Sequence, residues 1–174
     1  MSATRPRTQA REAALKALYL LDLRPDSSAL ELEEAMGEEL RSDEARRFAR
    51  GLLQGTRSRL AEIDAEVEAV AHNWNLKRMA VVDRNVLRLG AYELLFCRDE
   101  IPPAVAIDEA VSIVKRFSSR ESGAFVNGIL DKIRLRAERG EGQAPSAGPG
   151  PGQDQDAQAQ AQAQAHAQGQ EPPE

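Results

Sequence analysis

Five arginines lie in two groups whose chemistry is suited to binding phosphate. A guanidinium carries a permanent positive charge and a planar set of donors that can hold a phosphate through two hydrogen bonds. The second group flanks Ser118-Ser119, where a helix is predicted to begin, and the free backbone amides of a helix start also attract anions. Ordinary surface charge is the alternative, and these residues alone leave it open. The arginines are Arg5, Arg7 and Arg11 in the first group, and Arg116 and Arg120 in the second.

Side chains suited to metal binding or nucleophilic catalysis are scarce. The chain has two histidines, His72 and His166, and one cysteine, Cys97, whereas a zinc site takes several such ligands close together. The sequence contains neither a nucleophile-elbow motif nor a phosphate-binding P-loop. The carboxylates lie among Arg and Lys at helical spacing, which is typical of a solvated face. We therefore predict no metal, no cofactor and no enzymatic activity.

The sequence favours a cytoplasmic protein that does not contact a membrane. A single cysteine cannot form an internal disulfide, which is consistent with a reducing compartment. The N-terminus carries arginines and lacks the apolar core of a signal peptide. No uninterrupted apolar run approaches the roughly 20 residues that span a bilayer.

Residues 140–174 differ in composition from the rest of the chain. They contain Gly, Pro and an Ala-Gln alternation but no large apolar residue, so they cannot bury enough surface to offset the entropy lost on ordering. We predict a disordered spacer, with a regulatory or partner-binding role as the alternative. Five of the 28 acids and no Lys or Arg lie here, which leaves 23 acids and 23 bases in residues 1–139. Because a neutral body can hold a local basic patch, the net charge of −5 does not exclude nucleic acid.

The elements that must position the arginines are helices. Apolar residues recur at spacings of three and four along residues 1–139, and no strand-like alternation occurs. The predicted fold class is all-α, with two packed helical bundles of about 7–70 and 75–139 and a disordered C-terminal tail. Thr8, Asp83 and either Ser42 or Asp43 are plausible helix caps. Helices are predicted at about 8–23, 29–40, 43–70, 76–79, 83–97, 103–117 and from 121 onward.

Three of these helices carry more specific expectations. The helix over 43–70 presents one continuous apolar face, and Gly51 and Gly55 could admit a neighbouring helix closely. The helix over 103–117 is apolar on two faces, so we expect it to lie centrally. Asn127-Gly128 is unfavourable in mid-helix, which suggests a close helix contact or a buried side-chain hydrogen bond rather than contact with a ligand.

Six segments of the chain form a recognisable series, one in the first helix and the others in the C-terminal half. They are 10–19 (AREAALKALY), 82–94 (VDRNVLRLGAYEL), 101–103 (IPP), 105–110 (VAIDEA), 115–117 (KRF) and 125–132 (FVNGILDK). In this order and at this spacing they resemble the NusB family and imply a NusB-like fold. The resemblance covers roughly residues 7 to 135 and leaves the tail unmatched.

The resemblance implies two packed helical bundles without a cofactor. It also implies a function in transcription antitermination. Together with NusE, a small-subunit ribosomal protein, a NusB protein binds boxA RNA in the leader of nascent ribosomal-RNA transcripts. The complex joins other Nus factors on RNA polymerase and suppresses premature termination.

The resemblance also implies which residues face the RNA. Arg7 and Arg11 match the family's arginine-rich motif, and we expect both to be exposed, with Arg5 and Arg120 as weaker contacts. Positions 8 and 9, usually basic, are Thr and Gln here. Further along the chain, the RNA-side segment is matched by Glu121 and Phe125, although position 124, often basic, is Ala. Phe125 shares a stripe with Ile129 and Ile133, so core packing is the alternative for it.

The partner-facing side corresponds to the end of the first helix and the start of the 83–97 helix. Tyr19 and Asp83 match this side, with Arg84 and Leu87 as outward residues of the second helix. A half-buried aromatic is the alternative for Tyr19, and a simple helix cap is the alternative for Asp83.

Two other functions remain possible on the sequence alone. A NusB-like RNA-binding domain also occurs attached to ribosomal-RNA cytosine methyltransferases, where a large α/β domain would supply the cofactor loop. A helical scaffold that binds only proteins would explain why the arginine motif is incomplete. A salt-dependent RNA-binding measurement separates this scaffold from the antitermination factor.

Overall fold

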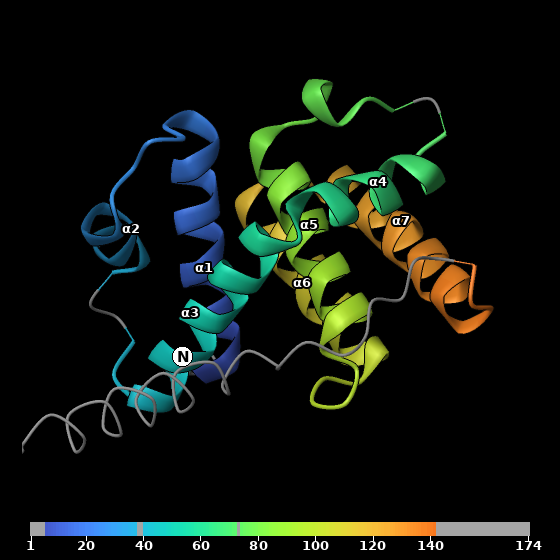
Figure 1. Cartoon of the computed structure of the whole chain (residues 1–174). Coiled ribbons are helices and arrows are strands. Elements are labelled where there is room, and N and C mark those ends of the chain that lie inside the picture. The colour runs from blue at the N-terminus through green and yellow to red at the C-terminus, as the bar shows by residue number, and fades with distance from the viewer. Residues whose placement is uncertain (1–5, 38–39, 73, 142–174) are drawn as a thin grey trace, which may run out of the picture.

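The structure is a computed structural model that describes residues 6–37, 40–72 and 74–141. Within these ranges the regular elements are all helical, which confirms the predicted all-α class. Figure 1 shows α1 and α2 at one side of the molecule and α7 at the other, with α5 between them. The elements are α1 (Pro6–Leu23), α2 (Ala29–Met36), α3 (Asp43–Ser58), α4 (Leu60–Val70), the short 3-10 helix η1 (Leu76–Arg78), α5 (Val81–Phe96), α6 (Pro103–Phe117) and α7 (Arg120–Glu138).

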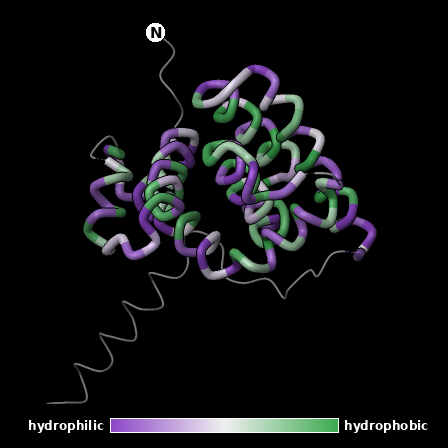
Figure 2. The backbone as a smooth tube through the Cα atoms, turned by 90° about the horizontal axis from the view of Figure 1, so that it is seen from above, coloured by the Kyte–Doolittle hydropathy of each residue, from purple (hydrophilic) through white to green (hydrophobic). Residues whose placement is uncertain are grey.

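The helix at the centre of the packing is α5. It packs against α1, α3, α4, α6 and α7, so the expectation that the 103–117 helix would be central is wrong. Hydropathy did not indicate a central position for α5, because this helix carries the polar residues Asn85, Arg88 and Glu93. All three side chains are buried, and each has a hydrogen-bonding partner. Figure 2 shows polar and apolar stretches alternating along the helices, as amphipathic packing requires.

The predicted single helix over 43–70 is wrong, because the chain turns at Arg59. There the backbone leaves helical geometry (φ −111°, ψ 15°), so that α3 packs on α1 while α4 packs on α5 and α7. The Arg59 guanidinium lies 5.1 Å from the centroid of the Phe96 ring and donates to Glu62 at 3.1 Å, which holds the turn against α5. Because α4 packs on two helices of the second predicted bundle, the division into bundles at residue 70 stays a prediction.

Helix ends follow local chemistry, with three departures from expectation. The first helix begins at Pro6, which suits a first turn, and the second ends at Met36 because Gly37 adopts a positive φ of 79°. Asp83 is not the cap of α5: Ala80 occupies that position, and the Asp83 carboxylate accepts a hydrogen bond from Ser122 on α7 at 2.8 Å. Ser119 caps α7 by accepting from the backbone N–H of Ser122.

Two mid-helix glycines have opposite surroundings. A Cβ on Gly55 would overlap the Tyr92 ring, so this glycine does admit a neighbouring helix closely. A Cβ on Gly128 would meet nothing within 4 Å. The expected close contact at Gly128 is therefore wrong, and the residue is exposed.

Candidate nucleic-acid interface

Contacts between α1 and α6 bring the two arginine groups to one edge of the molecule. Arg116, near the end of α6, pairs with Glu12 of α1 at 2.6 Å, and its side chain is 58% exposed. Arg7 lies one α-helical turn and a residue before Glu12 and is 54% exposed, with its guanidinium 4.0 Å from Glu44 and 5.0 Å from the centroid of the Phe48 ring. The two segments, over a hundred residues apart in sequence, therefore offer accessible guanidinium groups from adjoining helices. Arg5 lies outside the described residues.

The expectation that Arg11 is exposed is wrong. Its side chain is 3% exposed and lies over the ring of Phe48. Its Nε donates to Glu93 of α5 at 2.8 Å, and Nη1 lies 3.7 Å from Glu109 of α6. Arg11 thus fastens α1 to two other helices, and direct contact with RNA phosphates does not fit this position.

One guanidinium facing two carboxylates leaves this buried cluster with a net negative charge. Burial raises the pKa of Glu93 to about 7, because desolvation of its carboxylate outweighs the attraction of Arg11, and the neighbouring Glu109 adds to the rise. The cluster is therefore sensitive to proton uptake near neutral pH.

The start of α7 carries the second part of the predicted RNA side. Arg120 and Glu121 are both exposed. A basic residue that sequence reasoning missed, Lys115, lies close by, since a Cβ on Gly123 would meet its side-chain carbons at 2.6 to 3.3 Å. The sequence feature that could have indicated this contact is Gly123, since a glycine in the first turn of a helix leaves room for a long side chain to pass over that turn.

Phe125 belongs partly to the core and partly to the surface. It is half-buried, packs against the hydrophobic core and contacts Trp74, with ring centroids 5.0 Å apart and ring planes at 50°. Trp74 was not predicted as a functional residue, although it is 61% exposed. A lone tryptophan in a polar connecting segment was the available signal.

The residues predicted to face the protein partner differ in their exposure to solvent. Tyr19 is 40% exposed and available for contact. Leu87 is fully buried in α5, so its assignment as an outward residue is wrong: the α5 face that carries it points into the core. Arg84 is mostly buried and donates to Asp22 at 2.9 Å and to the Leu76 carbonyl at 3.0 Å, which leaves few donors for a partner.

Arg84 belongs to a network that ties α1 and α4 to α5. Arg88 donates to Asp64 of α4 at 2.8 Å through two nitrogens and contacts Asp22 at 3.2 Å. Burial acts to raise the pKa of Asp22, but hydrogen bonds from Arg84 and Asn85 and the charge of Arg88 outweigh it and lower that pKa. The network holds the beginning of α5 in register with the end of α1.

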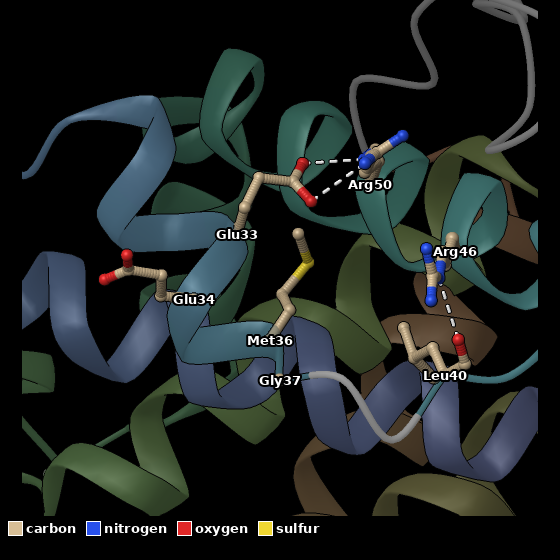
Figure 3. Close-up of a pocket in the computed structure, with 7 residues that line it drawn as sticks. All are labelled: Glu33, Glu34, Met36, Gly37, Leu40, Arg46 and Arg50. Carbon is tan, nitrogen blue, oxygen red and sulfur yellow. Dashed lines mark hydrogen bonds and ion pairs between the residues drawn. The ribbon is translucent and has the colours of Figure 1, made fainter.

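The hollow between α2 and α3 is not a second candidate site for an anionic ligand. Figure 3 shows that both of its arginines are used internally: Arg50 donates to Glu33 at 2.6 and 2.9 Å, and Arg46 donates to the Leu40 carbonyl at 2.8 Å. Among the described residues, no three His, Cys, Asp or Glu side chains are placed to hold a metal ion. In the same ranges, none of the helices has the length and apolar character needed to cross a membrane.

The fold and this edge define an all-helical protein in which α1, α6 and α7 each contribute an accessible arginine to the same edge. The chain belongs to the NusB family, whose profile matches residues 8–134. It is 46% identical over 131 residues to the transcription antitermination protein NusB of Myxococcus xanthus, covering 73% of this chain and 93% of that protein. The corresponding protein of Sorangium cellulosum is 45% identical over 127 residues, with coverages of 73% and 90%.

Solved structures of the family share the fold. T. maritima NusB superimposes with a TM-score of 0.70 at 40% identity, covering 82% of this chain and 96% of that one. A chain from the crystal structure of antitermination factors NusB and NusE in complex with double-stranded RNA superimposes with a TM-score of 0.68 at 30% identity. That match covers 76% of this chain and 98% of the solved one.

Proposed function

We propose that this chain is a transcription antitermination factor that binds boxA-type RNA in nascent ribosomal-RNA transcripts together with the NusE ribosomal protein. In this role it joins other Nus factors and RNA polymerase in the cytoplasm and suppresses premature termination without catalysing a reaction. Residues 1–139 serve as the binding body, and 140–174 are a separate tail. The family relationship supports this function, as does the related solved complex that contains NusB, NusE and RNA.

The observation that carries the proposal is the shared edge formed by the two arginine groups. The pair between Arg116 and Glu12 sets the end of α6 beside the start of α1. Arg7 and Arg120 then offer exposed charge from α1 and α7. Single-stranded RNA has closely spaced phosphates, so an edge with several accessible guanidinium groups can bind it mainly through charge.

Burial of Arg11 favours one other candidate, the scaffold that binds only proteins. One of the two arginines that match the family's RNA motif is used inside the fold, so fewer phosphate contacts remain. RNA affinity and its salt dependence separate the two functions, because only RNA binding releases counterions from phosphates.

The experiment is a fluorescence anisotropy titration of labelled boxA-like single-stranded RNA at several salt concentrations. Changing Arg7 to Ala should make the log–log salt slope shallower by about 0.7, the value for one phosphate contact in single strands. Scrambled RNA should be weakened similarly, because phosphate contacts carry no sequence information directly. Arg24→Ala at the opposite end of α1 is the matched control, because Arg24 is 64% exposed and, like Arg7, has a carboxylate nearby, Glu31 at 3.5 Å. No measurable RNA binding, with or without NusE, would exclude the proposed function and favour the scaffold.

A further inference from the structure

A groove follows the outer face of α7, where it meets the connection between α4 and η1. Two adjoining hollows of about 310 and 220 Å³ form it and share Val70, His72 and Lys132 in their walls. Trp74 and Phe125 line one end of the groove, and Arg139 lies at the other. Since Phe125 belongs to the first turns of α7, the groove starts where the predicted RNA side ends.

The charge of this groove differs from that of the whole chain. None of the residues that line either hollow is acidic, although the chain has 28 acids and 23 bases. The hollows elsewhere contain carboxylates, such as Glu33 between α2 and α3. Among the described residues Lys132 makes no ion pair, while Arg136 pairs with Glu66 at 3.4 Å and Arg139 with Glu141 at 3.1 Å. The walls therefore suit an anionic ligand.

Trp74 offers a flat surface at one end of the groove. Trp74 is 61% exposed, and its ring contacts the Phe125 ring with centroids 5.0 Å apart. The backbone N–H of Trp74 donates to the Ala71 carbonyl at 2.8 Å, which holds this part of the connecting segment. An exposed aromatic ring with a supported back is the platform on which nucleic-acid bases stack, and such stacking is tolerant of sequence.

Gly128 keeps the middle of the groove open. A glycine within α7 lowers helix stability relative to alanine, and no neighbouring atom lies within 4 Å of where its Cβ would be. Internal packing therefore does not require glycine here. Its exposed neighbour one turn earlier, Ala124, is also small. A longer side chain at position 128 would occupy the space between the tryptophan platform and Lys132.

We propose that this groove binds single-stranded RNA that continues beyond the segment held at the arginine edge. A base stacks on Trp74, the chain passes over Gly128, and Lys132 contacts a phosphate. This inference rests on the proposed function, and it adds a second contact surface to the same RNA. An anionic ligand with flat groups matches both ends of the groove, whereas an acidic protein segment would use only the basic end.

Trp74 is the only tryptophan of the chain, so its fluorescence reports on this groove directly. The probes are a boxA-like single-stranded RNA and the same RNA extended by about six nucleotides at each end, within the ~4–16 nucleotides covered by single-strand-binding folds. The extended RNA should quench Trp74 emission and protect it from acrylamide. The midpoint should agree with that from anisotropy of the labelled RNA.

Three variants test the groove independently of the fluorescence. Trp74→Ala and Gly128→Gln should each weaken binding of the extended RNA about tenfold, within the range measured for loss of one base stack, and should leave the short RNA unchanged. Lys132→Gln should make the salt slope shallower by about 0.7. Trp74→Phe and Gly128→Ala should bind within about twofold of the parent, because a ring and an open groove remain. Val105→Ala removes another exposed apolar side chain and is the control for surface changes.

The outcomes distinguish this inference from the proposed function. If the extended RNA binds while Trp74 emission and accessibility stay constant and the variants bind normally, the groove is not an RNA site, but antitermination remains supported. If the variants instead lose affinity for a NusE-type protein at unchanged RNA affinity, the groove is a protein surface and the inference is overturned. If neither RNA binds, both fail. Thermal unfolding of each variant confirms that the fold is retained.

Discussion

Arg11 shows how a permanently charged side chain is held inside this fold. It reaches two carboxylates and the face of an aromatic ring, so that its charge is matched on several sides. Removing one member of a buried ion pair leaves the other charge without compensation, which costs more than the pair itself contributes. At the residue scale, therefore, Arg7 and Arg11 have separate roles although they lie on the same helix: the first is available to RNA and the second secures α1.

Changing Arg11 to Ala should lower the free energy of unfolding by about 3–5 kcal/mol, the usual cost of breaking a buried pair. Changing Arg7 to Ala should lower it by about 1 kcal/mol or less, because an exposed ion pair and an exposed cation–π contact each contribute little. Urea denaturation followed by circular dichroism measures both. Equal stabilities for the two variants would contradict the buried role of Arg11.

Glu93 should make stability depend on pH. Its pKa is raised from 4.5 to about 7 in the folded protein, so between these values the folded state holds a proton that the unfolded state has released. Stability must then fall as pH rises from about 4.5 to about 7, by roughly 3 kcal/mol from this group. Glu93→Gln should lack this component, and unfolding free energies at pH 5 and pH 7.5 measure it. Parallel pH profiles for the variant and its parent would count against the assignment.

At the scale of helices, local sequence pattern determined where most helices form, whereas tertiary packing determined the turn at Arg59 and the central position of α5. Most helices were predictable because their apolar spacing and caps act over only a few residues, as Ser42 and Ser119 illustrate. The turn at Arg59 was not, because it depends on where α3 and α4 find partners. The central position of α5 was hidden as well, since hydropathy treats Arg88 and Glu93 as surface residues, and only their partners explain their burial. For the same reason the sequence drew attention to Arg7, Arg116 and Arg120 but not to Lys115 or Trp74.

The two mid-helix glycines provide a matched test of helix packing. Gly55→Ala should destabilise the protein by about 1–3 kcal/mol, because the added methyl overlaps a buried Tyr92 ring that stacks on Phe96. Gly128→Ala should stabilise it by about 1 kcal/mol, because alanine favours the helix and the new methyl meets nothing. Thermal midpoints of both variants measure the difference. A destabilising Gly128→Ala would mean that α7 has a neighbour at that point.

At the scale of the whole molecule, polar links and the apolar core connect the same helices. The network around Asp22 and Arg88 joins α1, α4 and α5, while Arg11 joins α1 to α5 and α6. The surfaces proposed for RNA are therefore attached to one core, so we expect the described helices to unfold together. This expectation can be tested with a probe at the centre of the fold.

Cys97 is that probe. It follows α5, is 2% exposed, and burial raises the pKa of its thiol to about 12. Since the thiolate is the reactive form, a thiol reagent should label it only after unfolding. The labelling rate should rise with urea in parallel with the unfolded fraction from circular dichroism. Rapid labelling of the native protein would show that the end of α5 opens separately.

The central claim is that this chain binds RNA jointly with a NusE-type ribosomal protein, and the most direct test is the affinity for labelled boxA-like RNA with and without saturating partner. With Arg11 buried, Arg7, Arg116 and Arg120 are the exposed arginines described at the proposed RNA edge, so the partner should supply part of the binding surface. We expect the partner to tighten RNA binding by about 5- to 150-fold, and RNA to tighten partner binding by the same factor. Equal RNA affinities in both titrations, or no binding in either, would contradict the account.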